Sequence, residues 1–445
     1  MRWYNVFKTL ANAWKISEIR SKILFTLLII ALYRIGVAIP VPFVDYQQLV
    51  NVSSEMTTGI FQYLNILSGD AFAQSKMFAL SVTPYINAQI IIQLLTVAIP
   101  KLEQMAKDGE AGRKKIDKLT RYLTIALAIV TSLGYYFLLD SYKLITDSDV
   151  SKVFKAIVMI ACFTAGSALI MWLGEKIDEQ GIGNGISMIL FANIVSGIPS
   201  IATTFVATLS AASKVAVWLK WVLGILTLLI VVGSLIFVTY MSDAERRIPV
   251  QYAKKVVGRK MYGGQNSNLP IKLNMSGVMP IIFASTIVSF VPTILYFVER
   301  FGGSFKEGTF WYVVKHLFDS DSAVYIALLF VLIIAFSYFY ISISFNPVEV
   351  SNNLMQQGGF IPGIRPGRPT AQYIKKVLNK VILMGAFFLG LIACVPLIIN
   401  AVSGGLLGVV SFSGSTLLIV VGVILETVRE LEAQMTMRHY KGFLE

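Results

Sequence analysis

The chain has 445 residues, of which 56% are hydrophobic and only 14% are charged, and its formal net charge is +13. This composition excludes an ordinary water-soluble globular protein and indicates a protein that lives in a membrane. The two cysteines and two histidines lie without metal-ligand spacing, so we expect no metal, no cofactor and no catalytic residue, and hence no enzyme.

Ten apolar runs approach the roughly 20 residues that a membrane-spanning helix needs. They cover residues 23–39, 77–99, 120–139, 153–173, 185–207, 217–240, 276–298, 323–343, 379–399 and 405–425. Ten spans divide into five and five, and an odd number in each half places the second half in the opposite orientation, as in inverted-repeat folds. We therefore predict an all-α membrane protein of ten transmembrane helices in two inverted halves.

A half-apolar segment between the first two runs, residues 60–73, is too short to cross a bilayer. It is interrupted by Ser68, Gly69 and Asp70, and the run that follows carries Pro84 and Asn87. Lipid offers no hydrogen bonds, so polar backbone at membrane depth must be covered by protein or line a water-filled cavity. The segment therefore predicts a re-entrant element beside a gated aqueous path.

The positive charges predict which side of the membrane each loop occupies. Most of the 38 Lys and Arg residues lie in 1–22, 100–121, 174–184, 241–273, 344–380 and 426–445. The positive-inside rule places these segments and both termini in the cytoplasm, although the short loop 174–184 is itself acidic. We expect a cytoplasmic N-terminal segment (1–22) without a removed signal peptide, a first half (23–207), a second half (208–425) with cytoplasmic loops at about 241–273 and 344–380, and a cytoplasmic tail (426–445).

Two pairs of aliphatic residues are candidates for a pore. Val82 and Ile86 are four residues apart, as are Ile186 and Leu190, so each pair shares one face of a helix. Spacing alone fits ordinary packing equally well, and the functional interpretation depends on neighbours such as the GIGNG sequence at 181–185, which allows a sharp turn into the next helix.

Two basic loops are candidates for docking an anionic partner. Arg365 lies in the sequence PGIRPG, whose prolines and glycines predict a stiff turn that presents the guanidinium outward. Six further basic residues in the earlier loop are expected to share this role: Arg246, Arg247, Lys254, Lys255, Arg259 and Lys260. The partner would be an acidic protein surface or nucleic-acid phosphate. Arg34, inside the first span, is expected to snorkel to the outer interface.

Six sequence motifs together resemble the SecY family of bacterial protein-conducting channels. They are TPYINAQIIIQLL (83–95), KDGEAGRKKIDKLTRY (107–122), GIGNGISMILFANIVSGIP (181–199), ERRIPVQYAKK (245–255), LPIKLNMSGVMPIIFAS (269–285) and PGIRPG (362–367). The resemblance implies a clamshell of two five-helix halves around an hourglass pore, which is closed by a plug and opens sideways toward lipid. Such a channel passes unfolded secretory polypeptides across the bacterial cytoplasmic membrane and releases apolar segments into lipid.

The resemblance also implies roles for particular residues. The constriction would be formed by Val82, Ile86, Ile186, Leu190, Ile282 and Ile419, and the plug would include Phe61, Leu64, Leu67, Asp70 and Phe72. The lateral gate would lie between 77–99 and 276–298, where Asn87, Gln93, Ser285, Thr286 and Ser289 supply weak polar contacts. The implied partners are the small membrane subunits SecE and SecG, the SecA motor ATPase and the ribosome.

Two other classes of function are compared with the channel. A secondary transporter also uses inverted repeats and broken helices, but a proton-coupled one normally carries acidic residues or histidine near mid-span, and this sequence shows none there. A membrane-embedded hydrolase would need a nucleophile, a base or a metal cluster, and no such set is evident.

Overall fold

The computed structural model describes residues 11–49, 65, 68–146, 150–211, 217–252, 255–257, 260–262, 266–302, 310–318, 322–402 and 413–441. The chain forms two compact units. Unit 1 comprises Met1–Ala207, Pro292–Lys315 and Val423–Glu445, and unit 2 comprises Thr208–Val291 and His316–Gly422.

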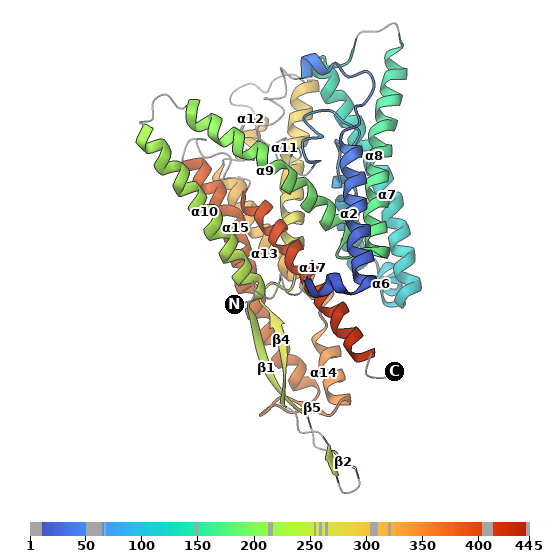
Figure 1. The fold of residues 1–445 in the computed structure, drawn as a ribbon, viewed down its shortest axis with the longest axis vertical. Coiled ribbons are helices and arrows are strands. Elements are labelled where there is room, and N and C mark those ends of the chain that lie inside the picture. The colour runs from blue at the N-terminus through green and yellow to red at the C-terminus, as the bar shows by residue number, and fades with distance from the viewer. Residues whose placement is uncertain are drawn as a thin grey trace. The chain divides into compact units, whose positions relative to one another are not determined.

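Helices dominate the described part of the chain (Figure 1). The first half carries α2 (Ser17–Val37), α5 (Thr83–Ala98), α6 (Pro100–Lys107), α7 (Gly109–Ser141), α8 (Lys152–Gln180) and α9 (Gly185–Ala211). They are followed by α10 (Val217–Asp243), α11 (Met279–Gly302), α12 (Phe310–Leu317), α13 (Ala323–Ser344), α14 (Pro347–Gln356), α15 (Arg368–Val402) and α17 (Ser413–Lys441).

These helices overlap each of the ten apolar runs of the sequence. By length and composition, five helices of the described chain can cross a membrane, or six if α5 and α6 are one broken span. The axes of α5 and α6 differ by 103°, and the bend falls at Ile99 and Pro100. A multi-pass, mostly helical membrane protein is therefore confirmed.

The second apolar run becomes helical later than its hydropathy indicates. Residues 71–82 form successive turns, and α5 begins only at Thr83. Ser75 and Ser81 have φ angles of 47° and 50°, which a right-handed helix does not contain. Pro84 then occupies the first turn of α5, where its missing N–H has no helical partner to lose.

The prediction of an all-α fold is wrong for the loop 241–273. Here β1 (Glu245–Tyr252) pairs antiparallel with β4 (Asn266–Lys272), and β2 (Lys255–Val257) pairs with β3 (Lys260–Tyr262). A short fifth strand, β5 (Gly359–Phe360), completes a sheet of order β4-β1-β5. Ile248 and Val250 of β1 are buried whereas Arg247 and Pro249 are exposed, so this charged segment has the alternation of a half-buried strand.

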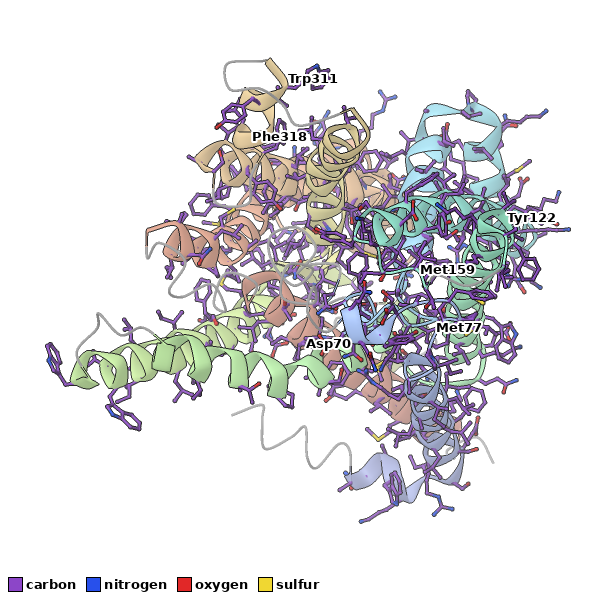
Figure 2. All side chains as sticks on the ribbon, turned by 90° about the horizontal axis from the view of Figure 1, so that it is seen from above. Asp70, Met77, Tyr122, Met159, Trp311 and Phe318 are labelled. Carbon is purple, nitrogen blue, oxygen red and sulfur yellow. The ribbon has the colours of Figure 1, made fainter. Side chains whose placement is uncertain are left out.

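The core of unit 1 lies between α7, α8 and the turns before α5. Phe163, Met159 and Leu139 are completely buried there, and Tyr135 packs against both Phe72 and Phe163. Met77 packs against this core and lies near Met159 (Figure 2). The irregular segment is thus covered by helices of its own unit, which satisfies the requirement that non-helical backbone be shielded from lipid.

The sheet of unit 2 shares one core with the ends of α13 and α15. Its buried residues are Ile248, Val250, Ile271, Ile341, Leu354, Ile361, Ile374, Leu378, Val381 and Ile382. In Figure 1, β1, β4, β5 and α14 gather at one end of unit 2, and β2 extends beyond them. The two long loops of the second half therefore form one folded structure.

Candidate functional site

The two aliphatic pairs of the first half lie at the beginnings of α5 and α9. Val82 is the residue before α5, and Ile86 follows one turn later. Ile186 and Leu190 occupy the first two turns of α9, and all four side chains are at most 8% exposed. The amide Nδ2 of Asn193 in α9 donates to Ser81 Oγ at 3.5 Å, so α9 lies against the residue that precedes Val82. The structure thus brings the α9 face near Leu190 to the start of α5.

The glycine-rich loop before α9 is held from three sides. Thr26 of α2 accepts a hydrogen bond from Ile182 N at 3.0 Å, Glu430 of α17 accepts from Gly183 N at 2.9 Å, and Asp178 of α8 accepts from Gly185 N at 2.7 Å. Gly183 has a φ of +81°, a conformation that favours glycine. The loop is therefore a fixed support that sets where α9 begins.

Gly185 also allows α9 to approach α8 closely. A Cβ atom at this position would lie 2.0 Å from the carbonyl oxygen of Gly174. Ile186, the next residue, lies directly against Gly174 as well. Since only glycine fits here, the sequence GIGNG determines the position of the aliphatic pair in α9.

The two remaining constriction candidates belong to unit 2. Ile282 lies in the first turn of α11 and Ile419 in α17, and both are buried. Of the six constriction residues that the resemblance predicts, four therefore belong to unit 1 and two to unit 2.

The plug candidates are only partly within the described chain. Phe61, Leu64 and Leu67 lie outside the described residues. Phe72 is buried, and its carbonyl oxygen accepts a hydrogen bond from the Tyr135 hydroxyl at 2.5 Å. Asp70 Oδ1 accepts from Asn65 Nδ2 at 2.8 Å. The described end of the candidate plug segment is therefore attached to α7 through Phe72 O, while the bond of Asp70 lies within the segment.

The lateral-gate candidates lie on α5 in unit 1 and on α11 in unit 2. Asn87 is buried, and its Oδ1 has no hydrogen-bond partner within the described part of the chain, while Gln93 is partly exposed. On α11, Ser285 is buried and donates to Ile281 O at 2.7 Å, and Thr286 is half-buried. The side chain of Ser289 lies outside the described set. Ser285 Oγ thus bonds within its own helix.

Arg365 lies at the exposed apex of a tight turn, as the sequence indicates. Gly363 and Gly367 have φ angles of +81° and +95°. Thr370 Oγ1 donates to the carbonyl oxygen of Arg365, and Ser351 Oγ donates to that of Gly367, both at 2.9 Å. The backbone is therefore fixed while the guanidinium faces solvent.

The earlier basic loop meets this turn through the sheet. Gln251 and Tyr252 of β1 pair with Phe360 and Gly359 of β5, directly before the turn of Arg365. Arg246 and Arg247 are exposed on β1, and Arg247 forms an ion pair with Glu245 at 2.6 Å. Lys254 and Arg259 lie outside the described residues, and for Lys255 and Lys260 only the backbone is described. The two basic loops are thus joined in one sheet.

Arg34, which the sequence predicts to snorkel to the outer interface, contacts α9. Its guanidinium Nη2 donates to the carbonyl oxygen of Ala192 and to the hydroxyl of Ser196, both in α9. A half-buried cation inside an apolar helix is costly unless its N–H groups find acceptors, and the carbonyl of Ala192 and the hydroxyl of Ser196 supply them. The sequence signal was present, since Arg34 is alone in its apolar run, but the partner helix was not predictable from it.

The chain is similar in sequence to known proteins over nearly its whole length. The SecY family model matches residues 76–428. The chain is 43% identical over 447 residues to the protein translocase subunit SecY of Streptomyces coelicolor, covering 98% of this chain and 99% of that protein. It is 41% identical over 440 residues to the SecY subunit of Mycobacterium bovis, covering 96% of this chain and 97% of that protein.

Solved structures show the same fold. A structure described as "The structure of a protein conducting channel" matches with a TM-score of 0.65 and 17% identity, over 94% of this chain and 92% of that chain. Sec61 in a canine ribosome-channel complex from the endoplasmic reticulum matches with a TM-score of 0.62 and 16% identity, over the same shares.

These comparisons confirm the resemblance drawn from the six motifs and give no support to a secondary transporter. The relatives are named translocase subunits and not enzymes, which agrees with the expectation of a non-enzymatic chain. The chain therefore belongs to the SecY family of protein translocase subunits.

Proposed function

We propose that this chain forms a protein-conducting channel that passes unfolded polypeptides across the bacterial cytoplasmic membrane and releases apolar segments sideways into lipid. The observation that carries the proposal is the burial of Val82, Ile86, Ile186 and Leu190 in a chain of this family, together with the contact between Asn193 of α9 and Ser81, the residue before Val82. A constriction of branched aliphatic side chains is too apolar to hydrate ions, so it seals when empty. The same side chains form no lasting hydrogen bonds to a passing polypeptide.

In this proposal the ring is completed by Ile282 and Ile419, and the segment at about 61–74 is the plug. A solved relative is described as a SecY protein whose plug domain stabilizes the closed state and maintains a membrane seal. The hydrogen bond from Tyr135 to Phe72 O supports an attachment of the same segment to α7 in this chain, and the bond between Asn65 and Asp70 supports its internal order. The lateral gate would lie between α5 and α11, where Asn87, Gln93, Ser285, Thr286 and Ser289 supply polar contacts that a signal sequence can replace.

The membrane topology remains part of the proposal. Ten spans in two inverted halves would place both termini and the sheet of unit 2 in the cytoplasm, in agreement with the distribution of Lys and Arg. The exposed Arg246, Arg247 and Arg365 then form a docking surface on the side where polypeptides are delivered. Lys254, Lys255, Arg259 and Lys260 belong to the same loop and would extend that surface.

The partners follow from charge and from uncovered apolar surface. Two of the structural neighbours are channels bound to ribosomes, and we assign the basic surface to the ribosome and to the SecA motor. Helix α10 carries Trp218, Trp221 and Tyr240, which are 68–75% exposed. Of the apolar part of this helix within Gly224–Asp243, only 6% is buried. This uncovered helix supports a place for small membrane subunits such as SecE and SecG.

Site-specific cross-linking tests the proposal. A photoreactive residue at Ile282 should cross-link to a stalled secretory chain in reconstituted vesicles, whereas one at the exposed Ile225 of α10 should not. Equal cross-linking from both positions, or none from Ile282, would show that Ile282 does not line the path of the polypeptide.

A further inference from the structure

Three segments of unit 1 meet at Gly69. They are the end of α2, which carries Arg34, the turn Ser68–Asp70, and the middle of α9, which carries Asn193. Figure 2 shows Asp70 on the pale blue segment close to the blue α2 of the same unit. Asn193 and Tyr33 are completely buried at this junction, and Asn193 Nδ2 donates to the Tyr33 hydroxyl at 2.8 Å.

Gly69 is packed directly against two of these side chains. A Cβ atom at this position would lie 2.9 Å from Asn193 Oδ1 and 3.0 Å from Arg34 Nη1. Gly69 has a φ of +62° and is followed by Asp70 at +69°, so two successive residues adopt the left-handed conformation. Since an aspartate there is strained relative to glycine, the surrounding contacts must hold the turn in place.

Arg34 supplies a cation on one side of the turn. Its guanidinium donates to Ala192 O and Ser196 Oγ of α9, and it interacts electrostatically with Asp70. Arg34 thus bridges α9 and the turn, and its planar fork serves both at once. A lysine would keep the charge but has a single nitrogen and cannot reproduce this fork.

Hydrogen bonds connect Asp70 and its neighbours within the turn. Its carboxylate accepts from Asn65 Nδ2, while Asn65 Oδ1 accepts from Ala73 N at 2.9 Å. Ser68 Oγ donates to Asn65 O and accepts from Phe72 N, each at 3.0 Å. The end of the proposed plug segment is therefore one hydrogen-bonded turn that contacts Arg34 and Asn193 at Gly69 and Tyr135 at Phe72.

We propose that Arg34 and Asn193 are positioning residues that hold the Ser68–Asp70 turn against α9, and that they keep the resting channel sealed in this way. The inference rests on the proposed function, because it assigns the turn to the plug segment. Helix α9 also carries Ile186 and Leu190, so a polypeptide that displaces α9 would withdraw the hydrogen-bond acceptors of Arg34. Opening of the constriction and release of the turn are thereby coupled.

The test compares Arg34→Gln with Lys155→Gln in the full chain, reconstituted in nanodiscs for amide hydrogen exchange and in planar bilayers for conductance. Lys155 is the control because it is a cation of unit 1, itself buried, that also donates to a backbone carbonyl, Thr146 O at 2.8 Å. We expect Arg34→Gln to speed exchange in residues 68–74 by about tenfold, since charge-assisted hydrogen bonds are lost, and to raise the resting ion conductance. Lys155→Gln should change neither quantity.

A second pair of variants guards against a general folding defect. Gly69→Ala forces a Cβ onto Arg34 and Asn193, whereas Gly109→Ala adds a Cβ at a similar φ of +71° with no atom within 4 Å. We expect Gly69→Ala to raise the resting ion conductance and Gly109→Ala to leave it unchanged. Arg34→Lys should raise the conductance as Gly69→Ala does and also speed hydrogen exchange in residues 68–74. Unchanged exchange at 68–74 in Arg34→Gln would overturn the positioning role, and faster exchange without a leak would overturn its link to the seal. Failure of the wild-type chain to export any polypeptide would instead count against the proposed function, because the exchange measurement does not depend on it.

Discussion

The backbone of Gln251 in β1 pairs with that of Phe360 in β5, so the two basic loops of unit 2 belong to one sheet. The turn that presents Arg365 begins directly after this pair, and its carbonyl groups are held by Thr370 and Ser351. A rigid base below an exposed guanidinium is suited to docking, because little conformational entropy is lost when a partner binds.

The first prediction concerns the charge of Arg365. Arg365→Glu should reduce polypeptide export into reconstituted vesicles by about tenfold or more, because a like charge then faces an anionic partner. Folding should be unaffected, since the side chain is exposed and only its backbone takes part in the turn. Lys376→Glu changes the net charge equally at another exposed position and serves as the control. Equal export by Arg365→Glu and wild type would remove Arg365 from the docking role.

The second prediction concerns the constriction. Changing Ile86, Ile186 and Ile282 together to Ser should make the resting channel conduct ions, because hydroxyl groups stabilise water in a constriction that branched aliphatic side chains keep dry. The measurement is the conductance of single channels in planar bilayers. The control changes the exposed Ile129, Ile157 and Ile225 to Ser and should leave the bilayer sealed. A triple variant in the constriction that is as tight as the control would refute the ring.

The third prediction concerns the approach of α8 and α9. Gly185→Ala should destabilise the chain by about 1–3 kcal/mol, because the added methyl group would lie 2.0 Å from Gly174 O and force the two helices apart. Thermal unfolding in detergent measures this loss. Gly197→Ala is the control within the same helix, since no atom lies within 4 Å of its Cβ position, and it should be neutral. Equal stability of the two variants would show that α9 does not need this close contact.

The fourth prediction concerns the buried hydroxyl of Tyr135. Tyr135→Phe should cost about 1–3 kcal/mol, because Phe72 O and Ser75 Oγ lose their hydrogen bonds to it in a buried site. Hydrogen exchange of residues 68–82 should increase accordingly. The neighbouring Tyr136→Phe is the control, since it removes the same atom from a hydroxyl with no hydrogen bond recorded among the described residues. Slow exchange retained in Tyr135→Phe would show that core packing alone holds the segment.

The sequence by itself determined that the chain is a multi-pass, mostly helical membrane protein, because the length and hydropathy of a span are local properties. It also determined the turn of Arg365, since proline and glycine restrict the backbone where they stand. The family was recognisable for a related reason: six motifs retain their residues and order along nearly the whole chain.

Only the tertiary structure decided where Arg34 points, where α5 begins and how the two basic loops combine. The acceptors of Arg34 lie on α9, far away in the chain, and no local pattern specifies which helix will supply them. The sheet was missed because β1 alternates between exposed residues such as Arg247 and the buried Ile248 and Val250, a pattern that gains meaning only when β4 and β5 pair with the two edges of β1. Contacts between distant segments depend on packing of the whole unit, and it is packing, not local propensity, that fixes these features.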